Sequence, residues 1–122
     1  MSDFHDFLKH EQAHVVIGEF KPGTFCEAQR LYNRAVSTYQ DGFREAFLLR
    51  EPGSDRGISI ILWNSVDQMD EQQRNNTHQA ILKEMNPLFK QVPHSEVYEL
   101  ASHITPQGIQ ASENVPAVGV LA

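Results

Sequence analysis

The segment from residue 42 to residue 65 carries apolar side chains on both faces of two predicted strands joined by one turn. Successive side chains alternate between the two faces of a strand, so the pattern assigns each residue to a face. On the first strand Phe43, Phe47 and Leu49 point one way and Ala46 and Leu48 the other; on the second, Ile58, Ile60 and Leu62 oppose Ile61 and Trp63. An antiparallel sheet with one solvated face would instead alternate apolar with polar residues. We therefore expect helices to cover one face of this hairpin and a second subunit to cover the other.

Two predicted helices flank the hairpin. Each begins with the spacing of a capping box, a Ser or Thr followed three residues later by Glu or Gln: Thr24 with Glu27, and Ser65 with Gln68. Apolar residues at helical spacing continue in the first helix as far as Tyr39, and the helix is expected to end near Gly42. The hydrophilic residues 71–77 predict a break in the second helix, which then continues towards Pro93.

The remaining strands are predicted at residues 14–20 and 95–102. The order strand, helix, strand, strand, helix, strand indicates an α+β fold of the ferredoxin-like βαββαβ type. In this fold both helices lie on one face of a four-stranded antiparallel sheet. Because the hairpin is apolar on its other face as well, we expect two copies to pair through their sheets as a homodimer.

The chain of 122 residues has the length of a single domain. The predicted elements divide it into an N-terminal leader (1–13), the ferredoxin-like domain (14–102) and a C-terminal arm (103–122). The arm is rich in Pro, Gly and small polar residues but ends in apolar ones. We expect it to lie on a partner subunit.

Charge and composition exclude several classes of function. The formal net charge of −6 and the scattered Lys and Arg residues argue against a nucleic-acid partner. No run approaches the roughly 18 apolar residues of a membrane span, and the N-terminus lacks the apolar core of a signal peptide, so we expect a cytoplasmic protein without a membrane partner. The single cysteine, Cys26, excludes an internal disulfide and a cysteine-rich zinc site.

Histidine spacing predicts no metal site. Apart from His78, the histidines are expected at termini or in loops, and none has a ligand-type partner on a predicted helix: His5, His10, His14, His94 and His103. We therefore expect neither a bound metal nor another cofactor.

The run GFREAFLLREPGSDRGISIILWNSVDQMD, from residue 42 to residue 70, resembles the antibiotic biosynthesis monooxygenase-like family of dimeric α+β barrel proteins. Members commonly show a Gly-Phe strand, a charged turn, an aliphatic strand ending in Trp, and then Ser and a short helix. The resemblance covers roughly residues 14–102. It implies that the sheets of two subunits pack face to face, and that each subunit holds a small apolar pocket between its own sheet and helices.

Family members include cofactor-free oxygenases of aromatic polyketides and haem-degrading enzymes. Some of the oxygenases carry an Asn four residues before the strand-ending Trp, and Ser59 stands at that position here. Haem-degrading relatives carry a second Trp in the following helix, whereas Trp63 is the only tryptophan of this chain.

Three residues are candidates for binding a ligand in the implied pocket: Trp63, Tyr32 and His78. The Trp63 indole either stacks on a flat ligand or packs in the core, and the buried phenol of Tyr32 needs a partner that is either a ligand oxygen or a core group. His78 is the candidate catalytic base, and its alternative is a solvated surface histidine near a helix start. Glu45, on an otherwise apolar strand, either pairs with a charge across strands or subunits or acts as a base in the pocket.

The resulting hypothesis is a homodimeric protein whose pocket binds a small aromatic or planar molecule and oxidises it without a cofactor. Such an enzyme supplies orientation, a dry site and a base, while the substrate carbanion itself reacts with dioxygen. The alternative is a noncatalytic binding or interaction module, because no acid, base or metal constellation stands out. A third hypothesis is haem binding through His78.

Overall fold

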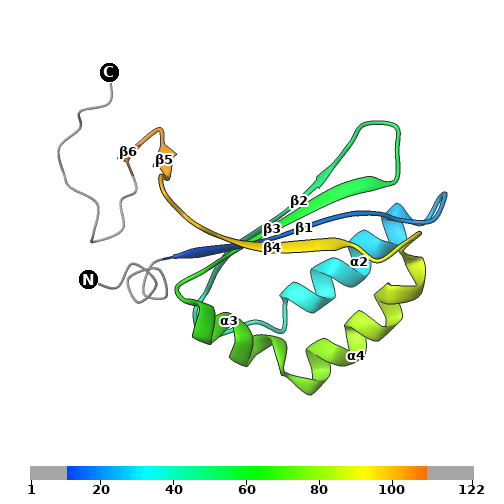
Figure 1. Cartoon of the computed structure of the whole chain (residues 1–122), viewed down its shortest axis with the longest axis horizontal. Helices are drawn as coiled ribbons and strands as arrows, with labels where there is room; N and C mark the ends of the chain where they lie inside the picture. The colour runs from blue at the N-terminus through cyan, green and yellow to red at the C-terminus, as the bar shows by residue number, and fades with distance from the viewer. Residues whose placement is uncertain (1–10, 110–122) are drawn as a thin grey trace.

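The computed structural model describes residues 11–109. It contains one four-stranded antiparallel sheet in the order β2-β3-β1-β4, with helices on one face (Figure 1). The elements are β1 (Gln12–Glu19), α2 (Phe25–Val36), β2 (Phe43–Arg50), β3 (Arg56–Trp63), α3 (Val66–Gln73), α4 (Asn76–Met85), the 3-10 turn η1 (Asn86–Leu88), β4 (His94–Glu99), β5 (Ile104–Thr105) and β6 (Gly108–Ile109). This arrangement confirms the predicted ferredoxin-like α+β fold.

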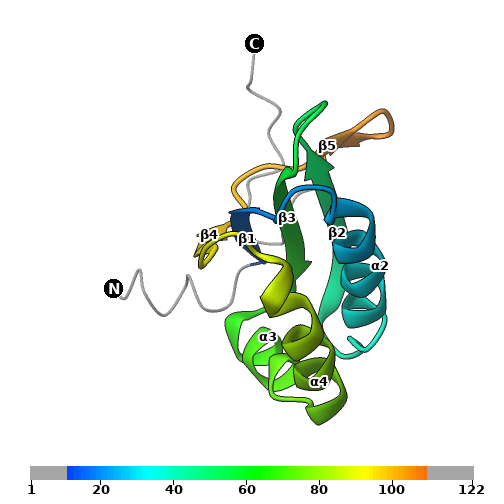
Figure 2. The same cartoon turned by 90° about the vertical axis from the view of Figure 1, so that its right-hand side faces the viewer.

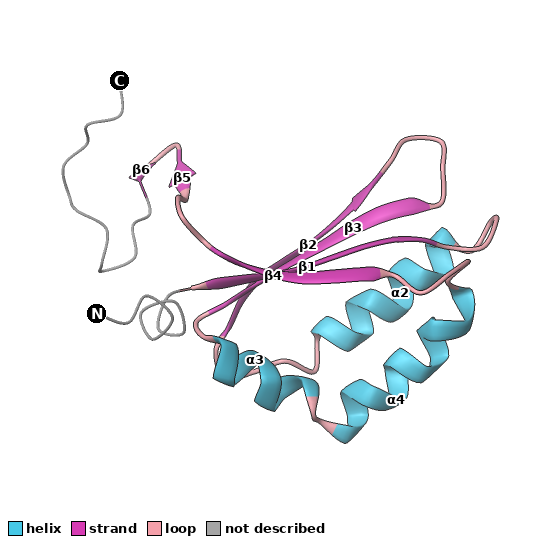
Figure 3. Cartoon of the chain, viewed as in Figure 1, coloured by secondary structure: helices cyan, strands magenta, loops and turns pink. Residues whose placement is uncertain are grey.

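The helix layer has the predicted break between α3 and α4. Asn75 caps the start of α4, because its side-chain oxygen accepts hydrogen bonds from the backbone N–H groups of Thr77 and His78. Figure 3 shows α2, α3 and α4 on the same side of the sheet, and in Figure 2 α2 and α4 lie next to each other. None of the helices within residues 11–109 has the length and apolar character needed to cross a bilayer.

Of the two predicted capping boxes, only the second forms its N-cap bond, and the Gln68 side chain accepts from the Ser65 hydroxyl at 3.3 Å, not from the Ser65 backbone. The Ser65 hydroxyl accepts from the backbone N–H of Gln68 at 3.2 Å. The Thr24 hydroxyl instead donates to the backbone oxygen of Lys21 at 2.8 Å and makes no capping bond, while Glu27 pairs with the neighbouring Arg30. The Thr24 hydroxyl therefore belongs to the Pro-Gly turn before α2, whereas the sequence spacing predicted that it caps the start of the helix.

The first helix is shorter than predicted. α2 ends at Val36, and residues 37–42 form turns that end at Gly42, whose φ of 86° favours glycine. Tyr39 consequently belongs to the connection between α2 and β2, yet its side chain is buried. This connection is important for the site because it places the Tyr39 hydroxyl at the start of α4.

A β-bulge in β2 places Phe43 on the opposite face of the sheet from the one predicted. The pairing of β2 with β3 shifts between Phe43 and Glu45, so that Phe43 lies opposite Trp63. The extra residue, Arg44, turns Phe43 towards the helix layer, whereas strict alternation puts it on the face of Phe47 and Leu49. Phe43 accordingly packs with Trp63, at a ring-centroid distance of 5.9 Å.

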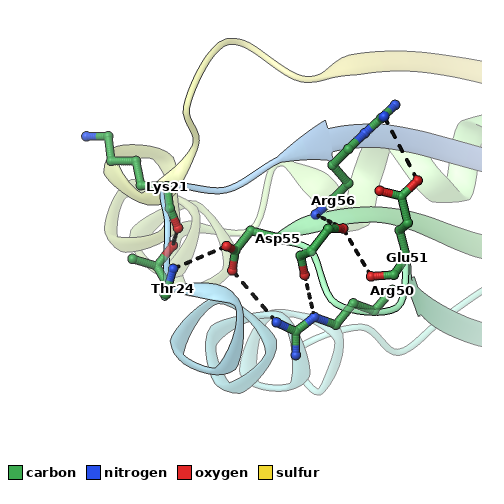
Figure 4. Close-up of polar contacts among 8 residues, drawn as sticks. Lys21, Thr24, Arg50, Glu51, Asp55 and Arg56 are labelled. Atoms are coloured by element: carbon green, nitrogen blue, oxygen red, sulfur yellow. Dashed lines mark hydrogen bonds and ion pairs between the residues drawn. The ribbon is translucent and has the colours of Figure 1, made fainter.

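The turn of the hairpin is tied to the start of α2 through Asp55 (Figure 4). The Asp55 carboxylate accepts from the backbone N–H of Gly23 at 3.2 Å and pairs with Arg50 at 3.8 Å, and its backbone oxygen accepts from Phe20. The Arg50 guanidinium also lies 4.5 Å from the ring centroid of Phe25. These contacts hold the first turn of α2 against the end of the sheet.

Two glycines face each other across β1 and β3 at this end of the sheet. Gly18 pairs with Gly57, and both lie on the face covered by helices. A Cβ atom on Gly57 would lie 2.9 Å from the backbone oxygen of Leu49 and 3.0 Å from the Phe25 ring, whereas one on Gly18 would lie 2.9 Å from the Phe89 ring. The missing side chains therefore give the phenylalanine rings room to lie on the sheet.

We predict that Gly57→Ala lowers the free energy of unfolding by about 1–3 kcal/mol, because the new methyl group is forced against backbone and a packed ring. Gly18→Ala should cost less, since its nearest neighbour is the edge of the Phe89 side chain. Urea denaturation of both variants measures the difference. Equal decreases in the free energy of unfolding of the two variants would contradict this prediction.

Candidate functional site

A pocket of about 290 Å³ lies between the sheet and the helix layer. Its volume is close to the lower end of the roughly 300–1,000 Å³ range of ligand pockets. Most of its lining is apolar and comes from β1, β3, α2 and α4, including Val16, Ala28, Ala35, Ile61, Leu82 and Met85. The polar side chains of the lining are His14, Tyr32, Tyr39, Ser59, Gln73, His78, Gln79, Asn86 and Ser95.

His78, the candidate base, is buried against the pocket and is not a surface histidine. Its side chain is 3% exposed, and its Nδ1 atom lies 3.2 Å from the backbone oxygen of Ala35. A carbonyl oxygen only accepts, so Nδ1 carries the hydrogen and Nε2 carries the lone pair. The Tyr39 hydroxyl then donates to Nε2 at 3.1 Å. Burial lowers the pKa of His78, and the hydrogen bond to Ala35 offsets part of this change.

His14 is a pocket histidine that the sequence analysis assigned to a terminus or loop. It lies within β1, on the same face as Val16 and Gly18. The alternation of β1 was the signal that identifies it, because Val16, Gly18 and Phe20 share its parity. Burial lowers the pKa of His14, and the negative charge of Asp70 partly offsets this effect.

The hydrogen bonds of His14 select the opposite tautomer from that of His78. Nδ1 of His14 lies 3.1 Å from the side-chain amide nitrogen of Gln73, and Nε2 lies 2.7 Å from the Ser95 hydroxyl. An amide nitrogen only donates, so Nδ1 accepts and Nε2–H donates to Ser95. The pocket therefore contains two neutral imidazoles, one on the sheet and one on the helix layer.

Gln73 connects the two histidines. Besides donating to His14, it forms a side-chain hydrogen bond that favours the ionised form of Tyr39, although burial has the larger effect and raises the pKa of that phenol. Tyr39 in turn donates to His78. A line of neutral polar groups thus extends from Ser95 on β4, through the end of α3, to the start of α4.

Tyr32 reaches the pocket from α2, and its hydroxyl is already occupied by protein groups. It donates to the backbone oxygen of Phe47 at 3.0 Å and accepts from the Ser59 hydroxyl at 3.1 Å. Burial raises the pKa of Tyr32, and the bond from Ser59 partly offsets the rise. Ser59, at the position where some oxygenases carry Asn, therefore positions the Tyr32 phenol.

Trp63, the third predicted ligand-binding residue, lies behind the pocket wall. It is fully buried and is not among the residues that line the pocket. Its ring centroid is 4.6 Å from that of Tyr39, in an edge-on arrangement. Of its two predicted roles, core packing matches this position, and Trp63 acts on the pocket by supporting Tyr39.

Glu45 is exposed on the face of the sheet that helices do not cover, on the same side as Phe47. It is therefore separated from the pocket by the sheet and cannot serve as its base. Of the alternatives given by the sequence, pairing with another charge is the one that this position permits.

The histidines do not form a metal centre within the described part of the chain. No group of three or more His, Cys, Asp or Glu side chains comes together there. Both ring nitrogens of His78 are engaged, Nδ1 by Ala35 and Nε2 by Tyr39, so it presents no lone pair to a haem iron. The residues present do not fit axial ligation of haem through His78.

The two buried histidines should make stability depend on pH. Their unfolded-state pKa is 6.5 and their folded-state values are lower, so the unfolded chain binds more protons near that pH. Their contribution is fully present above pH 6.5 and is lost as the pH falls through that value towards the folded-state pKa values.

We predict a lower urea midpoint at about pH 5 than at about pH 7.5, and a smaller difference in a His14→Gln, His78→Gln double variant. His94→Gln, which changes an exposed histidine of β4, is the control. An unchanged pH dependence in the double variant would contradict the prediction.

No family model matches the sequence. A search of curated proteins also finds no match.

Solved structures do match the fold. SnoaB, a cofactor-independent oxygenase from Streptomyces nogalater, is 18% identical, with a TM-score of 0.68 over 75% of this chain and 93% of that chain. A protein named an antibiotic biosynthesis monooxygenase from Caulobacter crescentus is 15% identical, with a TM-score of 0.70 over 79% and 94%. Another protein of that name, from Nitrosomonas europaea, is 12% identical, with a TM-score of 0.65 over 78% and 94%. At these identities the similarity establishes the fold: this chain has the fold of proteins named antibiotic biosynthesis monooxygenases.

Proposed function

We propose that this protein is a homodimer that binds a small, uncharged, flat aromatic molecule in its pocket and oxidises that molecule with dioxygen, without a bound cofactor. The observation that carries the proposal is the pocket itself. It is apolar except for a cluster of neutral hydrogen-bonding groups built around His14, Tyr39 and His78. A flat molecule with one polar group matches that lining, since its rings replace water at the apolar walls.

The lining favours an uncharged ligand. None of the described residues that line the pocket is Asp, Glu, Lys or Arg. An ion transferred into such a site loses its hydration without gaining a counter-charge, which costs much more than burying a neutral polar group. Nucleotides and simple carboxylates are therefore poor candidates, whereas phenols and aromatic ketones fit.

The oxidation is supported by the fold shared with a named cofactor-independent oxygenase and by the neutral imidazoles. In the proposed reaction a base takes one proton from an acidic CH₂ group, and the carbanion forms a carbon–oxygen bond with dioxygen. The protonated base returns its proton to the resulting peroxide, and loss of water from the hydroperoxide then leaves a carbonyl. One oxygen atom remains in the product and the other leaves as water, so the substrate supplies all the electrons that dioxygen takes up.

The homodimer is supported by the face of the sheet that no helix within residues 11–109 covers. We call it the open face and define it by six apolar residues: Val15, Ile17, Phe47, Leu49, Ile58 and Ile60. Ile17, Phe47 and Leu49 are 42%, 45% and 48% exposed. These residues are neighbours in three adjacent strands, and an exposed apolar patch of this kind marks an interaction surface. A second copy is the occupant that we propose.

We predict that Phe47→Asp weakens dimerisation by about 30-fold or more, because the charge would be buried between two apolar faces. Val92→Asp, at an almost fully exposed valine outside the sheet, is the matched control. Sedimentation velocity measures both variants. A wild-type chain that sediments as a monomer, or a Phe47→Asp variant that dimerises normally, would reject the open face as the interface.

We also predict that Val16→Phe lowers the affinity for 1-naphthol about tenfold or more, since the added ring occupies the pocket floor. Val92→Phe is the control, and native mass spectrometry reports the bound fraction. Normal binding by Val16→Phe would place the ligand elsewhere.

The oxidation has its own test. The protein should accelerate oxygen uptake by anthrone, a flat ketone with an acidic CH₂ group, and form anthraquinone with one dioxygen consumed per molecule. Binding of anthrone without faster oxygen uptake would reject the oxygenase and leave a noncatalytic binding protein.

A further inference from the structure

We propose that His14 is the residue that accepts a proton from the ligand, and that a ligand hydroxyl competes with the Gln73 amide for its Nδ1 atom. This inference rests on the proposed ligand pocket and specifies the chemistry at its polar end. It also moves the base from His78, the residue that the sequence favoured, to a residue on the opposite wall of the pocket.

His14 is oriented like a base. Its Nε2–H donates to Ser95 at 2.7 Å, which fixes the ring and leaves the lone pair on Nδ1. The donor that faces this lone pair is the side-chain amide of Gln73, at 3.1 Å. Gln73 is the last residue of α3 and is only partly buried, and its long, unbranched side chain can move to another rotamer at the cost of its hydrogen bonds to His14 and Tyr39.

The hydrogen-bond partner of the His78 lone pair is much harder to displace. Its partner is the hydroxyl of Tyr39, whose ring lies 4.6 Å from Trp63 and 5.8 Å from Phe43 between centroids. Core side chains are packed at the density of organic crystals, so the Tyr39 ring cannot move aside without opening a cavity. A ligand can therefore displace Gln73 from His14 more readily than Tyr39 from His78.

The surrounding charge also distinguishes the two histidines. Asp70, one turn before Gln73 on α3, acts on His14 in the direction that stabilises the imidazolium ion. His78 receives such support from the backbone oxygen of Ala35, not from a carboxylate. The negative charge of Asp70 therefore offsets part of the lost hydration of an imidazolium ion at His14, whereas at His78 a neutral carbonyl group does so.

The ligand class follows from the two ends of the pocket. The polar end presents the Nδ1 acceptor of His14, and the other end is formed by Phe20, Phe89 and the two facing glycines. A flat aromatic ring with a weakly acidic hydroxyl at one edge fits this arrangement. The hydroxyl donates to His14, and transfer of its proton leaves a phenolate paired with an imidazolium.

The test uses two probes of nearly the same shape, 4-nitrophenol and 4-nitroanisole, of which only the first has a hydroxyl. The 4-nitrophenolate ion absorbs visible light, so its formation on the protein can be followed at a pH where the free phenol is neutral. The variants are His14→Phe, Gln73→Ala and, as the matched control, Gln72→Ala. Gln72 adjoins Gln73, but its side chain accepts from the backbone of Gln40 and does not line the pocket.

We expect the wild-type protein to bind 4-nitrophenol more tightly than 4-nitroanisole and to show the phenolate band. His14→Phe should lose both properties. Gln73→Ala should bind 4-nitrophenol about three- to tenfold more tightly, with no matching gain for 4-nitroanisole, because it removes the competing hydrogen bond. Gln72→Ala should behave like the wild type.

The outcomes separate the two proposals. If neither probe binds the wild-type protein, both the ligand pocket and the role of His14 are rejected. If both probes bind equally and no phenolate forms, the pocket stands and the role of His14 is rejected. A phenolate band that persists in His14→Phe, or a Gln73→Ala variant with unchanged or weaker binding of 4-nitrophenol, would also overturn the assignment to His14.

Discussion

The pocket depends on two groups of aromatic rings that keep the helix layer away from the sheet. At one end Phe20, Phe25 and Phe89 pack over the facing glycines of β1 and β3; at the other, Tyr39 and Phe43 pack around Trp63. Between these groups the lining includes smaller side chains: Val16, Ala28, Ala35, Val36 and Ser59. Because rigid rings cannot be compressed, the helices cannot close onto the sheet between them. The space for a ligand therefore depends on the aromatic residues at the two ends of the pocket.

The polar end of the pocket owes its character to complementary donors and acceptors. The backbone oxygen of Ala35 can only accept a hydrogen bond, and the amide nitrogen of Gln73 can only donate one. The imidazoles of His78 and His14 therefore take opposite tautomers, and both are neutral. Burial reinforces this state by lowering the pKa of both histidines. A site of this kind can take up a proton without first losing one, which is the requirement for a general base.

The sequence pattern predicted the architecture well and individual contacts less well. The two-faced hairpin, the break before α4 and the Ser65 cap all follow from local periodicity, which depends on neighbours along the chain. The Thr24 cap did not form: the Thr24 hydroxyl donates to the backbone oxygen of Lys21 in the preceding turn and accepts no bond from the start of α2. The predicted face of Phe43 was wrong because a β-bulge changes the alternation of side chains, and the local sequence does not predict that bulge.

The sequence by itself determined the order of elements, the apolar character of both faces of the sheet, and the candidacy of Tyr32 and His78, because these depend on spacing. Only the tertiary structure decided which polar groups meet. His14 and Gln73 lie 59 positions apart in the chain, and Tyr39 and His78 lie 39 apart, so their contacts exist only after α3 and α4 pack against the sheet. Trp63 was assigned to the core in the same way, since the burial of a strand-ending indole depends on the helices and connections that cover it. Periodicity reports the face on which a side chain lies, but a hydrogen bond requires two faces to be brought together, and packing supplies that information.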